Sequence, residues 1–145
     1  MILLLLLALG AGVLLPVQAG VNAQLRSDVG SPLTAALVSF LVGSVGLAVV
    51  VVVLRFPMAL RTAWMASPWW HWVGGLIGAV YVVASIVLAP RLGAATLIAA
   101  VVAGQMIASL VLDQYGLVGF PTHPISGLRV VGAALVMGGV ILVQR

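Results

Sequence analysis

The sequence contains no cysteine, no lysine and no glutamate, and it has only two aspartates. The lack of cysteine excludes disulfides, thiolate metal sites and cysteine nucleophiles. All six basic residues are arginines that lie singly, so there is no basic patch for a nucleic-acid backbone and we expect no nucleic-acid partner. The chain also lacks a nucleophile–base pair, a metal-ligand set and a phosphate-binding loop. We therefore expect neither an enzyme nor a metal or cofactor site.

What the sequence has in excess is apolar residues, which make up 64% of the chain against 6% charged residues. Soluble domains do not reach this balance. The hydrocarbon core of a bilayer is crossed by about 20 helical residues. By that measure the apolar runs predict five membrane-spanning helices in a single transmembrane domain, residues 1–145, over 2–25, 32–54, 71–89, 93–112 and 124–143. The lipid bilayer is the first partner of such an all-α membrane protein.

All four tryptophans of the chain lie in the connection between the second and third predicted helices or in the first turn of that third helix, which is typical of an interfacial aromatic belt. Residues 57–66 are expected to form a short helix on the membrane surface. The first apolar segment also resembles a secretory signal with a small-residue cleavage site after Pro16. Because no Lys or Arg precedes it and its apolar character continues to Leu25, we expect a retained helix.

The arginines divide equally between the two sides of the membrane when five crossings are counted. One side receives Arg26, Arg91 and Arg145, and the other receives Arg55, Arg61 and Arg129. Orientation follows the Lys/Arg asymmetry of short loops. An equal count favours dual topology, in which two copies insert upside down relative to each other and form an antiparallel dimer of ten helices. The alternative is that one arginine, weighted by its position, still fixes a single orientation.

Three predicted helices each carry polar side chains four residues apart, which places each pair on one face. The pairs are Gln18 with Asn22, Tyr81 with Ser85, and Gln105 with Ser109. Polar groups within the hydrocarbon are costly and usually face a bundle interior or a cavity. The three stripes therefore predict a solute-binding cavity. The alternative is that each residue only makes a hydrogen bond between helices, which contributes about 1 kcal/mol or less.

Three charged residues lie at predicted helix ends. Asp113 and Arg129 fall on the same side of the membrane, so we expect an ion pair; the alternative is that Asp113 couples transport to a cation. Arg91 is placed at the start of the fourth predicted helix, where backbone N–H groups favour anions, or else it anchors that helix at the interface. Small residues four apart predict close helix packing in the dimer, at Gly74 and Gly78 and at Ala134 and Gly138.

An ordered set of short segments resembles one small family along the whole chain. The segments are 18–26, 30–33, 68–70, 90–95, 103–105 and 113–132. They resemble the YdcZ-type inner-membrane exporters of the drug/metabolite transporter superfamily, which is related to the small multidrug resistance transporters. The resemblance implies five helices per chain and relatives that assemble as antiparallel pairs or fused inverted repeats. The small multidrug resistance proteins have a central glutamate in their first helix, where this chain has Gln18, Asn22 and Gln24, so proton-coupled export of cationic drugs is not carried over.

Together these features predict a multi-pass protein of the bacterial inner membrane that moves a small polar or amphipathic solute by alternating access. The partner copy is a second identical chain or a paired homologue. Two alternatives remain open at this point. One is a passive channel formed by a dual-topology dimer, and the other is a non-transporting subunit of another membrane protein.

Overall fold

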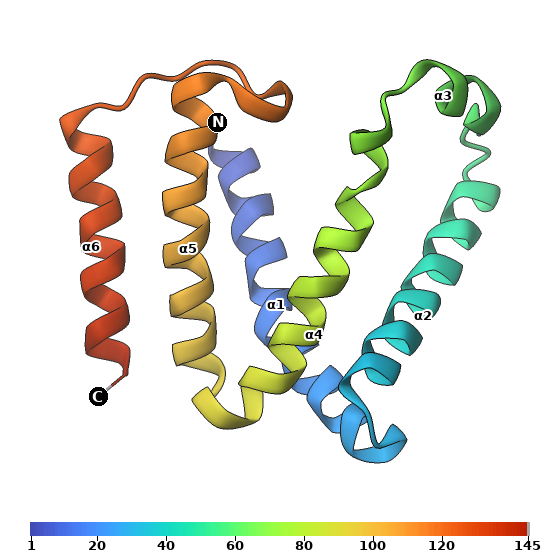
Figure 1. Cartoon of the computed structure of the whole chain (residues 1–145), viewed down its shortest axis with the longest axis horizontal. Coiled ribbons are helices and arrows are strands. Elements are labelled where there is room, and N and C mark those ends of the chain that lie inside the picture. The colour runs from blue at the N-terminus through green and yellow to red at the C-terminus, as the bar shows by residue number, and fades with distance from the viewer. Residues whose placement is uncertain (145) are drawn as a thin grey trace. The chain divides into compact units, whose positions relative to one another are not determined.

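The computed structural model describes residues 1–144, so Arg145, one of the six arginines in the orientation count, lies outside the described residues. Helices and their connections make up this part of the chain, and it contains no strand. Figure 1 shows the elements in order: α1 (Ile2–Val29), α2 (Pro32–Val53), α3 (Leu60–Ala66), the 3₁₀ turn η1 (Trp69–Trp72), α4 (Gly74–Leu92), α5 (Ala94–Tyr115), η2 (Leu117–Gly119) and α6 (Gly127–Val143). The prediction of an all-α chain is confirmed.

Four helical segments are long and apolar enough to cross a membrane within the described range: Ile2–Val29, Pro32–Val53, Trp69–Leu92 and Ala94–Tyr115. The last helix, α6, is also apolar but has 17 residues. At about 1.5 Å per residue it is roughly 25 Å long, near the lower limit for a crossing. The fifth predicted helix is therefore present, in a shorter form than expected.

The described residues fall into two compact units. The first unit combines residues 1–16 with residues 91–144, and the second is residues 17–90. The boundary in α1 follows Pro16, which lies inside the helix and has no N–H to donate to the preceding turn. Each unit is described separately below.

The second unit is built where the end of α1, the start of α2 and the later part of α4 meet. Its buried core consists of Ala35 and Ala36 of α2 with Val82 and Ile86 of α4, and Leu25, Tyr81 and Val83 pack against it. The alanines let the helix backbones approach closely, as small residues do in membrane helix packing. Further along α2 the helix is not buried by other parts of the chain, since residues 41–50 are all exposed.

The turn that starts α2 consists of three residues that each suit their position. Gly30 adopts a positive φ of 75°, Ser31 caps the helix by accepting a hydrogen bond from the Thr34 N–H, and Pro32 occupies the first turn. Proline suits this position because its missing N–H has no helical partner there. The sharp reversal places the start of α2 against the end of α1.

The first unit pairs α5 with α6, which run side by side in Figure 1. Leu97 of α5 and Ala133 of α6 are its buried apolar residues. Gly116, with φ 60°, ends α5 in the left-handed conformation, and its N–H donates to the Leu112 carbonyl. Ser126 caps α6 by accepting from the Arg129 N–H.

Several helix ends differ from the prediction. The first helix continues to Val29 rather than 25, because the chain breaks only at Gly30. The predicted start at residue 71 falls in η1, and α4 begins at Gly74. The surface helix expected over 57–66 is limited to Leu60–Ala66, the fourth helix runs to Tyr115 rather than 112, the second ends at Val53, and the last begins at Gly127.

The connection between α4 and α5 is also shorter than the gap of residues 90–92 between the two predicted helices. Pro90 and Leu92 lie inside α4, and the chain reverses at Gly93 with φ 76°. Pro90 has no N–H to donate to the preceding turn, yet the helix continues for two residues after it. A side chain at residue 93 would be strained at this φ, so glycine is the residue that permits the turn.

Candidate solute-binding site

A hollow with three polar side chains in its lining opens between α1 and α2 in the second unit. Its volume is about 230 Å³, and its lining is Gln18 of α1 with Ser39, Phe40, Gly43, Ser44 and Leu47 of α2. Three of these six residues carry an amide or a hydroxyl, in segments long enough to span a membrane. No charged residue lines it. The hollow can therefore offer a neutral solute hydrogen-bond donors and acceptors beside an aromatic ring.

Most of the hollow is lined by one face of α2, for which the sequence predicted no polar role. Positions 40, 43, 44 and 47 recur at helical spacing and so share one face. Gly43 carries no side chain, which leaves room beside the Gln18 amide. Ser39 and Ser44 are the lining residues that the sequence analysis missed as ligands. The detectable signal was the spacing of small and hydroxyl residues opposite the Gln18 stripe.

Two further predicted residues are buried in the same unit. Asn22 of α1 and Ser85 of α4 are each 5% exposed, and they are the buried polar residues of the described chain. The Ser85 hydroxyl donates to the Tyr81 carbonyl of its own helix at 2.9 Å. Tyr81 is half-buried against the apolar core. The Ser85 hydroxyl thus has its hydrogen-bond partner within α4. Asn22 lies on α1, one helical turn after Gln18.

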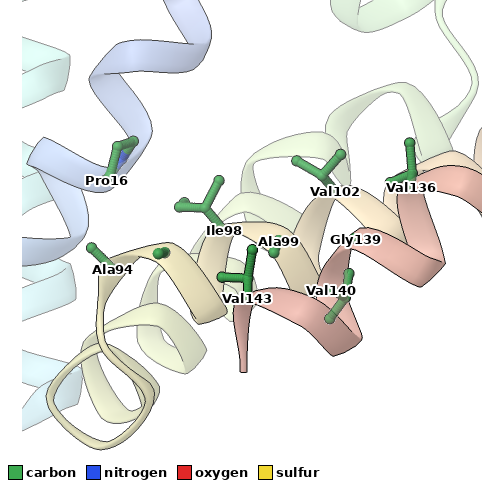
Figure 2. A pocket seen from close by; sticks show the side chains of 10 residues that line it. Pro16, Ala94, Ile98, Ala99, Val102, Val136, Gly139, Val140 and Val143 are labelled. Carbon is green, nitrogen blue, oxygen red and sulfur yellow. The ribbon is translucent and has the colours of Figure 1, made fainter. Parts of the chain in front are cut away.

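Gln105 and Ser109 belong to the other unit, on α5, and both are exposed. A hollow of about 550 Å³ in that unit lies between α5 and α6, near Pro16, and neither residue lines it. Figure 2 shows the side chains around it, and all of the lining residues are apolar: Pro16, Ala94, Ala95, Ile98, Ala99, Val102, Val136, Gly139, Val140 and Val143. Such a lining offers a polar solute no hydrogen bond.

Two charged side chains of the first unit, Asp113 and Arg129, meet beside the loop between α5 and α6. Arg129 and Asp113 form a salt bridge, the pairing that the sequence analysis expects. Arg129 also donates to the His123 carbonyl at 2.8 Å, and the His123 N–H donates to the Asp113 carbonyl at 2.8 Å. The Gln114 side chain accepts from the Ile125 N–H at 2.6 Å. These bonds tie the loop to the end of α5.

The salt bridge faces a hollow of about 890 Å³ lined by Met1, Leu5, Asp113, His123, Pro124 and Arg129. Asp113 lies inside the last turn of α5 rather than in the following loop, because that helix continues to Tyr115. Its carboxylate is engaged by Arg129. Within residues 1–144, no three His, Asp or Glu side chains come together in a way that would hold a metal ion.

Arg91 lies in the last turn of α4, which differs from the expected position at the start of the next helix. At a helix C-terminus a cation interacts favourably with the exposed carbonyl groups and the helix dipole. The N–H groups at the start of α5 follow Gly93, two residues further on. The structure therefore places Arg91 where it complements the end of its own helix.

The predicted small-residue faces lie in different surroundings. A Cβ added at Gly78 would lie 3.5 Å from the Phe40 ring, so Gly78 packs against α2 of its own chain. Gly74 and Gly138 have open space around the same position. Ala134 is exposed on α6. Gly78 thus serves packing within the chain, and the other three leave free faces.

A family model described as "Putative inner membrane exporter, YdcZ" matches residues 3–142, nearly the whole chain. The chain belongs to this family. The inner membrane protein YdcZ of Escherichia coli (strain K12) is 42% identical over 77 residues, which cover 53% of this chain and 51% of that protein. The match thus spans about half the length of that relative. No solved structure matches the chain. Family membership and the apolar helices identify a multi-pass protein of the inner membrane, so the predicted resemblance and location are confirmed.

Proposed function

We propose that this chain is one half of a transporter for a small, uncharged polar or amphipathic solute. The observation that carries the proposal is the polar hollow of about 230 Å³ between α1 and α2. Because no charged residue lines it, a solute there is recognised by hydrogen bonds to Gln18, Ser39 and Ser44. Asn22, Tyr81 and Ser85 belong to the same unit but do not line this hollow.

The proposed assembly is an antiparallel dimer with α6 as the fifth crossing of each chain. Gln105 and Ser109 are exposed on α5, and polar groups facing lipid are costly. A second copy covers that face and adds both side chains to the solute pathway. The free faces at Gly74, Ala134 and Gly138 allow the close helix contacts that a dimer uses. A paired homologue is the other candidate for the second subunit.

Alternating access follows from the symmetry of such a pair. Two oppositely inserted copies have two equivalent arrangements, one open to each side of the membrane. Exchange between them moves the site from one side to the other without unfolding either copy. Because the Asp113 carboxylate is paired with Arg129, our mechanism assigns it to the loop rather than to the solute.

The flux experiment compares Gln18→Leu with Gln24→Leu. Gln24 is exposed on the same helix and does not line the hollow, so it is the matched control. Liposomes containing the purified chain are loaded with a mixture of sugars, polyols and neutral amino acids, and counterflow is measured by mass spectrometry. Gln18→Leu should exchange solute roughly tenfold more slowly, because the site loses one or two hydrogen bonds to the solute. Gln24→Leu should retain wild-type exchange.

The flux result distinguishes the other functions as well. Equal counterflow in both variants would remove Gln18 from the pathway and contradict the proposed site. Electrical conductance without counterflow would assign a channel. Absence of any flux from a purified chain that remains monomeric would indicate a non-transporting subunit.

The orientation experiment uses the natural absence of cysteine. Thr122→Cys introduces a single thiol in the exposed connection between α5 and α6. In intact cells a membrane-impermeant maleimide should label about half of the copies, and permeabilisation should expose the remainder, because equal arginine numbers give no bias to insertion. Ser31→Cys, in the connection between α1 and α2, should give the same half-labelling. Complete labelling at one position and none at the other would exclude the antiparallel homodimer.

A further inference from the structure

The four tryptophans of this chain all lie between residues 64 and 72, and three of them line an open hollow. Trp64 of α3 and Trp69 and Trp72 of η1 line it together with Ser67, and its volume is about 300 Å³. The Trp64 and Trp72 ring centroids are 5.2 Å apart with an angle of 55° between the planes. The two rings thus form a corner, and Trp69 supplies a third wall.

Trp70 lies outside the hollow. It contacts Trp69 and His71 edge to face, with centroid distances of 6.2 and 5.8 Å. The segment therefore contains three tryptophans with a common cavity and one without. An interfacial belt alone needs only rings at the level of the headgroups and does not require that three of them converge.

The charges of the surrounding segment restrict what fits this corner. Residues 55–72 contain Arg55 and Arg61 but no aspartate or glutamate, so a free metal ion or a small, strongly hydrated cation finds no counter-charge. Aromatic faces instead attract weakly hydrated ammonium groups. Arg61 precedes Trp64 by three residues on α3 and thus shares its face. A ligand with both an ammonium and a phosphate matches the rings and the guanidinium together.

We propose that Trp64, Trp69 and Trp72 form a cage for the alkylammonium group of a phosphate ester, with Arg61 on the phosphate. The source of that chemistry is the headgroup of a zwitterionic phospholipid. The cage lies on the connection between two helices long enough to cross the membrane, and such a connection emerges at the headgroup level. This inference concerns a lipid site and does not depend on the transport proposal.

The test uses the full chain purified in a maltoside detergent, which carries neither ammonium nor phosphate. Short-chain phosphatidylcholine and phosphatidylglycerol are titrated separately; both have the phosphate and only the first has the ammonium. Because every tryptophan lies in this segment, intrinsic tryptophan fluorescence reports on it alone. We expect a saturable change with phosphatidylcholine at an affinity about 5- to 10-fold higher than with phosphatidylglycerol.

Ring variants locate the binding group. Trp72→Leu should weaken phosphatidylcholine binding about 5-fold, Trp72→Phe should recover most of it, and Trp70→Leu should leave the midpoint unchanged. Arg61→Gln should weaken both lipids equally and should lower their sensitivity to salt. Helical content and elution volume, measured for each variant, establish that the fold is retained. Equal affinity for both lipids, or equal losses in Trp70→Leu and Trp72→Leu, would overturn the cage.

A third titration uses free phosphocholine. Binding as tight as that of the lipid would support the cage and assign it to a soluble ligand. Binding that requires the acyl chains would support it and assign it to the membrane lipid. Failure of both phosphocholine and phosphatidylcholine to change the fluorescence would refute the proposal.

Discussion

The two units of this chain treat their polar residues in opposite ways. Residues 17–90 keep uncharged groups within long apolar helices, where Asn22 and Ser85 are buried and Gln18 lines a hollow. In residues 91–144, the Asp113 side chain at the end of α5 is paired with Arg129 in the first turn of α6. The Asp113 and Arg129 charges are already paired, whereas Gln18, Ser39 and Ser44 line a hollow that a solute can enter. A solute competes poorly for a carboxylate that holds a guanidinium, whereas Gln18 and the serines opposite it are open to one.

The comparison also explains how each unit is held together. Lipid surrounds a membrane protein with an apolar solvent, so burying aliphatic side chains gives little net gain and close packing matters more. The core of the second unit accordingly uses Ala35 and Ala36 against Val82 and Ile86. The first unit adds hydrogen bonds across the α5–α6 loop.

The largest expected loss of stability comes from enlarging Gly78. A Cβ there would lie in ordinary contact with the Phe40 ring, at 3.5 Å, so Gly78→Ala should be tolerated. The further atoms of Gly78→Leu would collide with the ring, and overpacking of this kind costs about 1–3 kcal/mol. Thermal unfolding in detergent should show the loss.

Gly74→Leu is the matched control, because its surroundings are open. Its monomer stability should equal that of the wild type. If Gly74 contributes to the dimer as proposed, the same variant should weaken dimer formation in cross-linking. Equal destabilisation by Gly74→Leu and Gly78→Leu would contradict the assignment of Gly78 to packing within the chain.

These two glycines illustrate what the sequence can predict. Long apolar runs identify the helices because a continuous helix satisfies its own backbone hydrogen bonds in lipid. The spacing of Gly74 and Gly78 indicates a close contact, but it does not tell which helix makes it. That information depends on the Phe40 ring, 38 positions from Gly78 along the chain.

Helix ends and hydroxyl groups show the same limit. Pro90 suggests a helix end in the sequence. The reversal of the chain, however, requires a positive φ, which Gly93 adopts three residues later. Ser39 and Ser44 look like packing residues because a hydroxyl is small and is often satisfied by its own helix. Only their position opposite Gln18 distinguishes them. In contrast, the Asp113–Arg129 pair is predictable, since charged residues are so scarce that few partners exist.

A smaller loss of stability is expected from Asp113→Ala. The side chains of Arg129 and Asp113 are 33% and 23% exposed, so water screens their attraction and the loss is about 1 kcal/mol rather than the larger cost of a fully buried pair. Arg129 retains its bond to the His123 carbonyl, which limits the effect to the loop. Asp28→Ala is the control, because Asp28 is exposed and the described residues give it no salt bridge. Thermal unfolding in detergent should separate the two variants, while the Gln18-dependent exchange should survive in both. Loss of exchange in Asp113→Ala without loss of stability would show that the Asp113 carboxylate takes part in transport rather than in holding the loop. The contrast between the two units would then no longer hold.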